Sequence, residues 1–364
     1  MTIGILGGGQ LGRMLALAGY PLGLQFKVFD PSSEAVAGQI APLLAEDIND
    51  TPALLWFSKG LDAVTYEWEN VPVQSARYLE QRAPVFPPPK ALEIAQDRLK
   101  EKSFFRENGV PTPDFCAVET KAEFELALKE IGLPCVLKTR RFGYDGKGQF
   151  VLKTRRDAEK AWEKLGGVPL ILEAFVPFSR EVSVICVRNR GGEKRFYPLV
   201  ENHHAEGILR LSLAPAPGWS APLQSDAEKF AGEILEKLDY VGVMALELFQ
   251  VGERLLANEI APRVHNSGHW TIEGSACSQF ENHIRAVAGL PLGETAMKTP
   301  FAAMVNLIGE LPPLCEVLKI EGAHAHYYGK EIKPGRKVGH ITVVASDETT
   351  LQNRVENVRK LLKN

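Results

Sequence analysis

The spacing of apolar residues predicts strands alternating with helices over roughly the first 95 positions. Short apolar runs over 2–7, 25–30 and 63–68 have the length and composition of buried strands, and 11–19 has helical spacing. Strands that alternate with helices form parallel sheets covered by helices. We therefore expect a Rossmann-like N-terminal domain.

A proline-dense stretch over 83–92 predicts a linker after this domain. One long amphipathic helix is expected to follow over 90–109, ending at a glycine.

Beyond residue 110 the pattern changes to closely spaced strands. Helices are predicted over 122–132, 155–167, 226–238 and 279–288, with another at the C-terminus. Strands are predicted over 134–140, 148–153, 170–176, 180–189, 194–202, 208–216, 242–251, 254–263, 302–308, 323–329 and 340–346. Short connections between strands favour an antiparallel sheet. The expected fold class is α/β with an α+β middle, and the expected domains are 1–98, 99–175, 176–300 and 301–364.

Composition excludes several classes of protein. The 364 residues carry a net charge of −3, without the basic surplus of a nucleic-acid-binding protein. No apolar run approaches the ~18 residues of a membrane span. The five cysteines are scattered without a C-x-x-C pair, and the N-terminus reads as a strand rather than a signal peptide. These features predict a globular cytoplasmic protein with reduced thiols.

A glycine-rich turn follows the first predicted strand. Gly7, Gly9 and Gly12 satisfy G-x-G-x-x-G, and Asp30 ends the second strand eighteen residues later. This arrangement is nearly the dinucleotide fingerprint, in which backbone N–H groups at a helix N-terminus hold a pyrophosphate. A nicotinamide or flavin oxidoreductase is therefore one hypothesis.

The predicted hairpin over 242–263 carries two glutamates. A turn centred on Glu253 pairs Val251 with Leu255, Phe249 with Ala257, and Glu247 with Glu259. Carboxylates directly opposite each other repel, and a cation such as Mg²⁺ between them would relieve the repulsion. Asn258 points to the other face of an ideal strand, so its participation needs a bulge. The alternative is two glutamates on a solvated face.

The segment over 136–151 combines Lys138, near the end of a strand, with a loop of three glycines over 143–148. Such a loop can surround an anion with N–H groups, although it is not a Walker motif and also suits an ordinary hairpin turn. Glu173 interrupts an apolar run, so it needs a hydrogen-bond donor. An exocyclic amine of a base or an arginine would serve.

Two further segments are rich in cationic and polar residues. Residues 261–270 include Arg263, His265, Asn266 and His269, which suit a small planar anion. The tail contributes Lys330, Arg336 and Lys337, which suit a phosphate or, equally, a solvated basic turn.

Taken together, "GILGGGQLGRM", "YEWENVP", "QDRLKEK", "RFGYDGKGQ", "ANEIAPRVHNSGHW" and "YGK…GRKVGH" resemble the ATP-grasp superfamily. Within it, the chain is similar to the N5-carboxyaminoimidazole ribonucleotide synthetase family. The resemblance runs from residue 3 to about 340. It implies an N-terminal Rossmann-like (pre-ATP-grasp) domain, a central ATP-grasp lid with an antiparallel sheet, and a small C-terminal domain.

The resemblance also implies a ligase reaction in purine biosynthesis. 5-Aminoimidazole ribonucleotide, bicarbonate and ATP would give the N5-carboxy product, ADP and phosphate through carboxyphosphate. The implied ATP ligands are Arg98, Lys138, Gly143, Tyr144, Asp145, Gly146, Lys147, Gly148, Gln149, Glu173, Ala174, Phe175, Val176, Glu181 and His204. Glu247 and Glu259 would bind Mg²⁺, with Asn258 adjoining.

For the other substrates, the resemblance places Arg263, His265, Asn266 and Lys337 at bicarbonate. Asp145 and Lys147 would reach the aminoimidazole, although the family loop often carries arginine in place of Lys147. The aminoimidazole ribonucleotide would also contact Gly9, Gln10, Leu11, Glu69, Lys330 and Arg336. On this interpretation, free N–H groups of Gly7–Gly12 line the substrate rather than a dinucleotide. A homodimer is expected by analogy with the family.

Three alternatives remain at this point. The dinucleotide fingerprint favours an oxidoreductase. Another ATP-grasp ligase, such as a formate-using relative of glycinamide ribonucleotide transformylase, would share the nucleotide motifs but should carry a different pocket at "RVHNSGHW". A non-catalytic scaffold would leave the paired glutamates and Lys138 without a purpose.

Overall fold

The computed structural model describes residues 1–143 and 148–362. The N-terminal part is a parallel sheet in the order β3-β2-β1-β4, as the alternating pattern predicted. Its elements are β1 (Thr2–Leu6), α1 (Gln10–Gly19), η1 (Tyr20–Leu22), β2 (Gln25–Asp30), η2 (Val36–Gln39), β3 (Leu43–Ala45), α2 (Thr51–Phe57), β4 (Ala63–Tyr66) and α3 (Val73–Glu80).

The predicted helix over 90–109 is wrong in one respect, because it is two helices. They are α4 (Pro89–Ala95) and α5 (Arg98–Glu107). Asp97 between them has an extended backbone and accepts hydrogen bonds from the N–H groups of Leu99 and Lys100, so it caps a new helix. The proline-dense linker is packed rather than loose: Val85 is buried and bridges to Val64.

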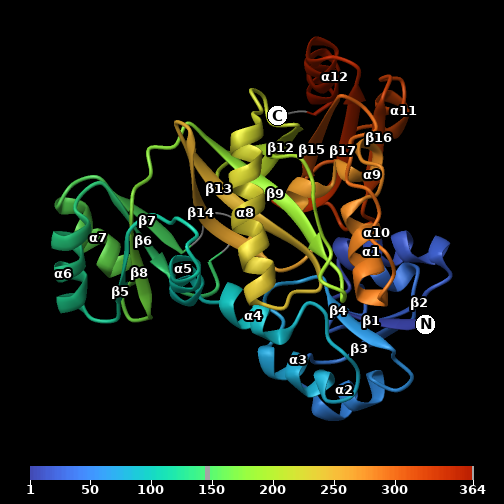
Figure 1. Ribbon diagram of the computed structural model, residues 1–364, viewed down its shortest axis with the longest axis horizontal. Coiled ribbons are helices and arrows are strands. Elements are labelled where there is room, and N and C mark those ends of the chain that lie inside the picture. Colours follow the sequence, from blue (N-terminus) through green and yellow to red (C-terminus); the bar gives the residue numbers. More distant parts are fainter. Residues whose placement is uncertain (144–147, 363–364) are drawn as a thin grey trace.

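A small antiparallel sheet in the order β5-β8-β6-β7 follows. Its elements are β5 (Phe115–Val118), α6 (Lys121–Ile131), β6 (Cys135–Thr139), β7 (Gln149–Leu152), α7 (Arg156–Leu165) and β8 (Leu170–Ala174). Strand β5 was missed by the sequence analysis. This unit forms the lobe at the left of Figure 1.

The remaining strands form one large antiparallel sheet of nine strands, in the order β14-β13-β9-β11-β12-β15-β17-β16, with β10 beside β9. Its elements are β9 (Arg180–Arg188), β10 (Lys194–Phe196), β11 (Val200–Ala205), β12 (Ile208–Ala214), α8 (Ala221–Lys237), β13 (Gly242–Val251), β14 (Arg254–Ala261), η3 (Asn266–Gly268), α9 (Thr271–Gly274), α10 (Gln279–Ala288), β15 (Phe301–Ile308), α11 (Leu314–Val317), β16 (Ala323–Tyr327), β17 (Lys337–Ala345) and α12 (Glu348–Lys360). The strand predicted over 194–202 is thus divided into β10 and β11.

Helix α10 joins the parallel sheet to the large sheet. Ile284 on α10 shares one apolar core with Ile5 of β1 and Val243 of β13. His283 bonds to Thr65 Oγ1 at 2.7 Å and accepts from the Val243 N–H at 3.0 Å. No helix among the described residues has the length and apolar character to cross a membrane.

Candidate active site

The β13–β14 hairpin places Glu247 opposite Glu259, as predicted. The register near the turn is different from the prediction: Val251 pairs with Arg254, and Ala257 pairs with Leu248. The predicted Val251–Leu255 and Phe249–Ala257 pairs are wrong because the turn has two residues, beginning at Gly252 with a φ of 60°. A bulge between Glu247 and Leu248 then restores the glutamate pair.

Asn258 is the extra residue of this bulge, since Ala257 pairs with Leu248 and Glu259 with Glu247. A bulge bends its strand and redirects the side chains around it. The sequence analysis required such a feature if Asn258 was to act with Glu259, and the structure supplies it.

The two carboxylates have unequal partners. Arg98 Nη1 lies 2.9 Å from Glu259 Oε2, whereas Glu247 Oε1 lies 3.2 Å from His265 Nε2. Burial and the nearby positive charge of Arg263 lower the pKa of His265 well below its usual value, so it is neutral. Burial and the charge of Glu259 raise the pKa of Glu247 to about 8. Two negative charges side by side are therefore unfavourable at this pair, and a cation between the carboxylates would stabilise the ionised form of both.

Glu173 lies between two lysines. Lys138 Nζ donates to Glu173 Oε2 at 2.9 Å, and Lys102 Nζ is 3.6 Å from the same oxygen. Burial acts against ionisation, yet the charges of Lys102 and Lys138 lower the pKa of Glu173 to about 2. Lysine is thus the donor, in place of the arginine considered from the sequence. Glu173 Oε1 is buried and has no hydrogen-bond partner among the described residues, so it can accept from a ligand.

Glu181 on β9 and His204 on β11 lie together, and a register shift precedes His204 in the pairing of β11 with β12. His204 Nδ1 is 2.8 Å from Glu181 Oε2. Although burial opposes the charged form, the Glu181 carboxylate raises the pKa of His204. This contact fixes the Glu181 carboxylate beside the large sheet.

The glycine loop between β6 and β7 is described only at its ends. Tyr144, Asp145, Gly146 and Lys147, all predicted site residues, lie outside the described residues. At the ends of the loop, Gln149 pairs with Lys138, Gly148 has a φ of 73°, and the Gly143 carbonyl accepts from Arg98 Nη2 at 3.4 Å. Ala174, Phe175 and Val176 follow Glu173 at the end of β8.

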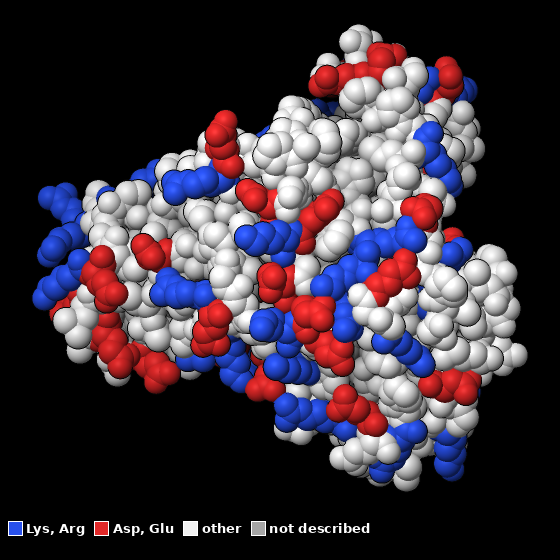
Figure 2. Space-filling model, viewed as in Figure 1, with Lys and Arg blue, Asp and Glu red and all other residues white. Residues whose placement is uncertain are grey.

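The segment after β14 brings several predicted residues together. Arg263 Nε donates to Glu69, which the sequence analysis had placed with a different substrate. Burial opposes ionisation of the Glu69 carboxyl, but the Arg263 guanidinium outweighs this effect and lowers the pKa of Glu69. Lys337, at the start of β17, acts on the same carboxylate. Figure 2 shows acidic and basic side chains side by side across the middle of the molecule.

Asn266 and His269 differ in accessibility to a ligand. Both amide atoms of Asn266 are buried without a hydrogen-bond partner in the part of the chain that the structure describes. His269 instead packs in the interior against His340 and Phe280, and Gln279 Nε2 lies 3.2 Å from its Nδ1. Asn266 can therefore meet a ligand, whereas His269 supports the segment from behind.

The N–H groups of the glycines in the first glycine turn are not free, which corrects the sequence prediction for Gly8, Gly9 and Gly12. Gly9 N donates to Glu67 Oε1 at 2.6 Å, and Gly12 N donates to Glu67 Oε2 at 2.7 Å. Gly8 N donates to Asp30 Oδ2 at 2.7 Å. The anion of this helix N-terminus is thus a side chain of the protein itself. Burial raises the pKa of Glu67.

The sequence analysis missed Glu67, although the topology could have indicated it. Leu6 and Tyr66 are partners at the carboxyl ends of β1 and β4, so the residue after Tyr66 must face the turn after Leu6. Gln10, at the start of α1, accepts from Lys330 Nζ, and Leu11 is buried in the core. Arg336 is exposed and lies near Glu331, with Nη1 3.5 Å from its carbonyl oxygen.

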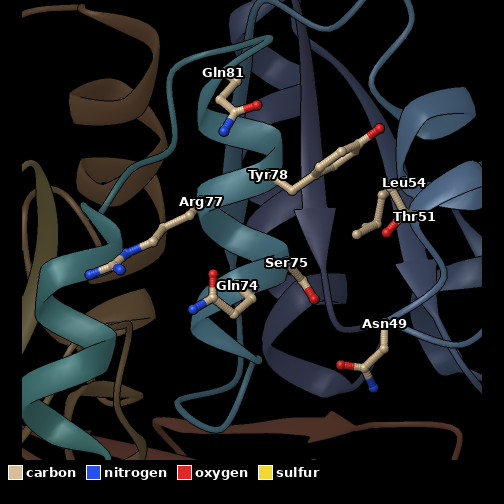
Figure 3. Close-up of a pocket in the computed structure, with 8 residues that line it drawn as sticks. All are labelled: Asn49, Thr51, Leu54, Gln74, Ser75, Arg77, Tyr78 and Gln81. Carbon is tan, nitrogen blue, oxygen red and sulfur yellow. The ribbon is translucent and has the colours of Figure 1, made fainter.

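A cavity of about 300 Å³ lies elsewhere, between α2 and α3. Its lining, drawn in Figure 3, includes Asn49, Thr51, Arg77 and Tyr78 and none of the predicted site residues. This cavity is therefore not part of the candidate site at the hairpin.

Three family models match successive parts of the chain. Residues 1–96 match a ribonucleotide synthetase preATP-grasp domain, residues 103–280 an ATP-grasp domain, and residues 302–354 a phosphoribosylaminoimidazole carboxylase C-terminal domain.

Full-length relatives are also similar. The chain is 53% identical to the N5-carboxyaminoimidazole ribonucleotide synthase of Pseudomonas aeruginosa, over 100% of this chain and 99% of that one. The crystal structure of N5-carboxyaminoimidazole ribonucleotide synthetase from Thermus thermophilus is 61% identical, with a TM-score of 0.96, covering 100% and 99% of the two chains. A synthase from Aspergillus clavatus, in complex with ADP and 5-aminoimidazole ribonucleotide, is 32% identical, with a TM-score of 0.89 and coverage of 99% and 98%.

Proposed function

The chain belongs to the N5-carboxyaminoimidazole ribonucleotide synthase family of ATP-grasp ligases, and we propose that the residues around the β13–β14 hairpin perform its reaction. The enzyme carboxylates 5-aminoimidazole ribonucleotide at the expense of ATP, in purine biosynthesis. The observation that carries the assignment of the site is the Glu247–Glu259 pair, which lies beside both Arg98 and His265.

Mg²⁺ is proposed at Glu247 and Glu259, with the Asn258 amide adjoining. The donor set fits a hard cation, because carboxylate oxygens in register carry charge that Arg98 neutralises only in part. Among the described residues no cluster of three or more acidic, histidine or cysteine side chains could hold a metal, so phosphate oxygens and water must complete the coordination. Bound there, Mg²⁺ supplies positive charge to the nucleotide phosphates.

The proposed nucleotide residues divide by chemistry. Lys138 and Arg98 provide positive charge for the phosphates, and the loop over 143–149 provides N–H groups. The unpartnered Glu173 Oε1 would accept from the adenine amine, next to backbone of Ala174, Phe175 and Val176. Glu181, held by His204, would accept from the ribose hydroxyls.

Bicarbonate is proposed to lie against Arg263, His265, Asn266 and Lys337. One of its oxygens attacks the γ-phosphorus, the bond to the β-phosphate oxygen breaks, and ADP leaves. Attack on ATP needs no general base, because bicarbonate is already an anion, and the lowered pKa of His265 makes this residue a weak base. The amine of the ribonucleotide then attacks the carboxyl carbon of carboxyphosphate, the bond from that carbon to the bridging oxygen breaks, and phosphate leaves and takes up the proton that the amine loses. Carboxyphosphate must be kept from water, which the loop Gly143–Gln149 would do.

For the ribonucleotide, Lys330 and Arg336 are proposed as phosphate ligands, and Asp145 and Lys147 as contacts from the loop. Gln10 is held toward Lys330 by their hydrogen bond. Gly9 can contribute only through atoms other than its N–H, and Leu11 through its backbone. Glu69 is proposed to act through Arg263, to which it is paired.

Three further properties are proposed from the family resemblance and the composition. The enzyme works in the cytoplasm, consistent with five cysteines that form no disulfide. It is a homodimer. Its domains are 1–98, 99–175, 176–300 and 301–364.

The test is a coupled assay of ADP release with ATP, Mg²⁺ and 5-aminoimidazole ribonucleotide, with and without bicarbonate. Full turnover should require both bicarbonate and the ribonucleotide. ADP release at the same rate without either of them would contradict the proposal.

A further inference from the structure

One edge of the large sheet, strand β14, is covered by helix α5 and by the segment that follows it. Strand β14 is the last strand in the sheet order, so half of its backbone groups have no strand partner. The Ala257 carbonyl accepts from Lys102 Nζ at 3.1 Å, and the Ile260 N–H donates to Glu101 Oε1 at 2.8 Å. The Ala257 N–H donates to the Pro111 carbonyl at 2.7 Å. Figure 1 shows α5 between the small sheet and β14.

The spacing of these contacts marks the bulge. In a regular strand, outward-facing backbone groups recur at every second residue. Here they occur at Ala257 and Ile260, three residues apart, because Asn258 is the extra residue. Lys102 therefore holds the strand just before the bulge, and Glu101 holds it just after Glu259.

The same face of α5 reaches the site directly. Arg98, Glu101 and Lys102 have the i, i+3, i+4 spacing of one helix face. Arg98 contacts the Glu259 carboxylate, and Lys102 lies 3.6 Å from Glu173 Oε2 on the small sheet. One face of α5 thus contacts the hairpin on both sides of the bulge. The same face also contacts Glu173, a proposed nucleotide ligand.

Burial makes a purely edge-covering role costly. Glu101 and Lys102 are 2% and 1% exposed. Burying ionisable groups is unfavourable unless each is paired, and an uncharged polar side chain could satisfy the N–H and C=O groups of a strand edge at lower cost, whereas an apolar one would leave them unpaired. Specific polar contacts to the backbone at the bulge account for the presence of these two residues.

We propose that Glu101 and Lys102 are positioning residues that hold the β14 bulge, so that Asn258 and Glu259 are presented toward Glu247 for metal binding. Through Lys102, the same helix sets the place of Glu173 relative to the hairpin. This inference rests on the proposed Mg²⁺ site.

The test measures Mn²⁺ binding by electron paramagnetic resonance, with ADP present, in the full-length protein. Glu101→Leu removes the acceptor for the Ile260 N–H and should weaken Mn²⁺ binding at least about tenfold, as losses of supporting contacts do at other metal sites. Glu101→Gln keeps an acceptor oxygen in place and should bind Mn²⁺ within about threefold of the wild type. In turnover, Glu101→Leu should raise KM for ATP and leave KM for the ribonucleotide within about twofold.

Phe57→Leu is the control for stability, because Phe57 on α2 is buried in a core that contains no residue of the hairpin. It should lower Tm and leave Mn²⁺ affinity unchanged. If Glu101→Leu does not fold, Lys102→Met removes the contact to the Ala257 carbonyl and should show the same loss of affinity.

Two results would overturn the proposal: wild-type Mn²⁺ affinity in the variant that lacks the contact, or an equal loss in Glu101→Gln and Glu101→Leu. The metal assignment fails separately, if wild-type protein binds no Mn²⁺ or if Glu259→Gln binds it as tightly as the wild type.

Discussion

The glycine turn after β1 and the β13–β14 hairpin are both suited to ions, but the fold completes only one of them. At the turn, the Glu67 carboxylate accepts from Gly9 and Gly12, so the N–H groups are satisfied within the protein. At the hairpin, Glu247 and Glu259 face each other, and only Glu259 has a guanidinium partner. The N–H groups of Gly9 and Gly12 thus have a partner within the protein, whereas the two hairpin carboxylates lie close together and a bound cation would stabilise the ionised form of both.

The comparison shows that a sequence motif typical of nucleotide binding need not leave its N–H groups available to a nucleotide. The G-x-G-x-x-G spacing is a familiar nucleotide signal, yet its N–H groups here hold a strand-end glutamate. The paired glutamates are a weak signal in sequence, because they depend on register, yet they lie at the centre of the proposed chemistry. Unsatisfied charge, rather than the motif, marks the site.

The largest effect is expected at the hairpin. Glu259→Gln removes a charged oxygen ligand and should lower kcat by at least about 100-fold, with Tm within about 2 °C of the wild type. The coupled ADP assay and a thermal melt check both parts. Glu253→Gln, at the exposed turn of the same hairpin, is the control and should be fully active. Normal activity of Glu259→Gln would contradict the proposal that the hairpin, unlike the glycine turn, binds an ion.

The next effect concerns the nucleotide side. Lys138→Met removes a charge-assisted hydrogen bond to Glu173 and a cation for the phosphates, and should weaken ATP binding by about 2 kcal/mol, or roughly 30-fold. Calorimetric titration with ATP measures the change. Lys153→Met, at an exposed lysine after β7, should leave the dissociation constant unchanged. An unaltered constant in Lys138→Met would count against the phosphate role.

At the turn, substitution should change stability and leave ATP binding intact. A Cβ at Gly9 would lie 2.4 Å from Glu67 Oε1, so Gly9→Ala displaces the carboxylate and should cost about 1–3 kcal/mol in the free energy of unfolding. Gly232→Ala, whose Cβ would meet only Phe196 at 3.7 Å, should be neutral or stabilising. Urea unfolding and ATP titration distinguish the outcomes. A loss of ATP affinity as large as that of Lys138→Met would assign nucleotide binding to the turn.

The smallest effect tests how the two regions are joined. Burial lowers the pKa of His283 to about 3, whereas an unfolded histidine has a pKa of about 6.5. Between these values the unfolded chain binds more protons, so the stability from neutral His283 is present above pH 6.5 and is lost as pH falls. At pH 5.5 the loss is about 1.4 kcal/mol. Between pH 7.5 and 5.5, the change in the free energy of unfolding measured with urea should be smaller by that amount in His283→Gln than in the wild type, and an unchanged pH dependence would contradict the assignment.

Much of the fold could be predicted from periodicity and connection length. The parallel N-terminal sheet and the antiparallel remainder follow from local patterns. The break between α4 and α5 was missed because a polar residue, Asp97, continues a helical pattern while its side chain starts a new helix. The place of β15 beside β12 depends on contacts between distant segments, which periodicity does not encode.

The candidate site was predictable where chemistry and register agree, as at Glu247 and Glu259. Glu67 was missed because its partners lie 55 and 58 residues away, at the end of another strand. Glu101 and Lys102 were missed because charged residues on an amphipathic helix are usually solvated. Their burial became visible only when α5 was placed against the edge of β14.

The most direct test of the reaction assigned to the hairpin region uses bicarbonate labelled with ¹⁸O. If bicarbonate oxygen attacks the γ-phosphorus, the bridging oxygen of carboxyphosphate leaves with the phosphate. Mass spectrometry of a rapid single turnover should then find one ¹⁸O in each inorganic phosphate released. Phosphate without ¹⁸O would show that water attacks ATP, and would contradict the account.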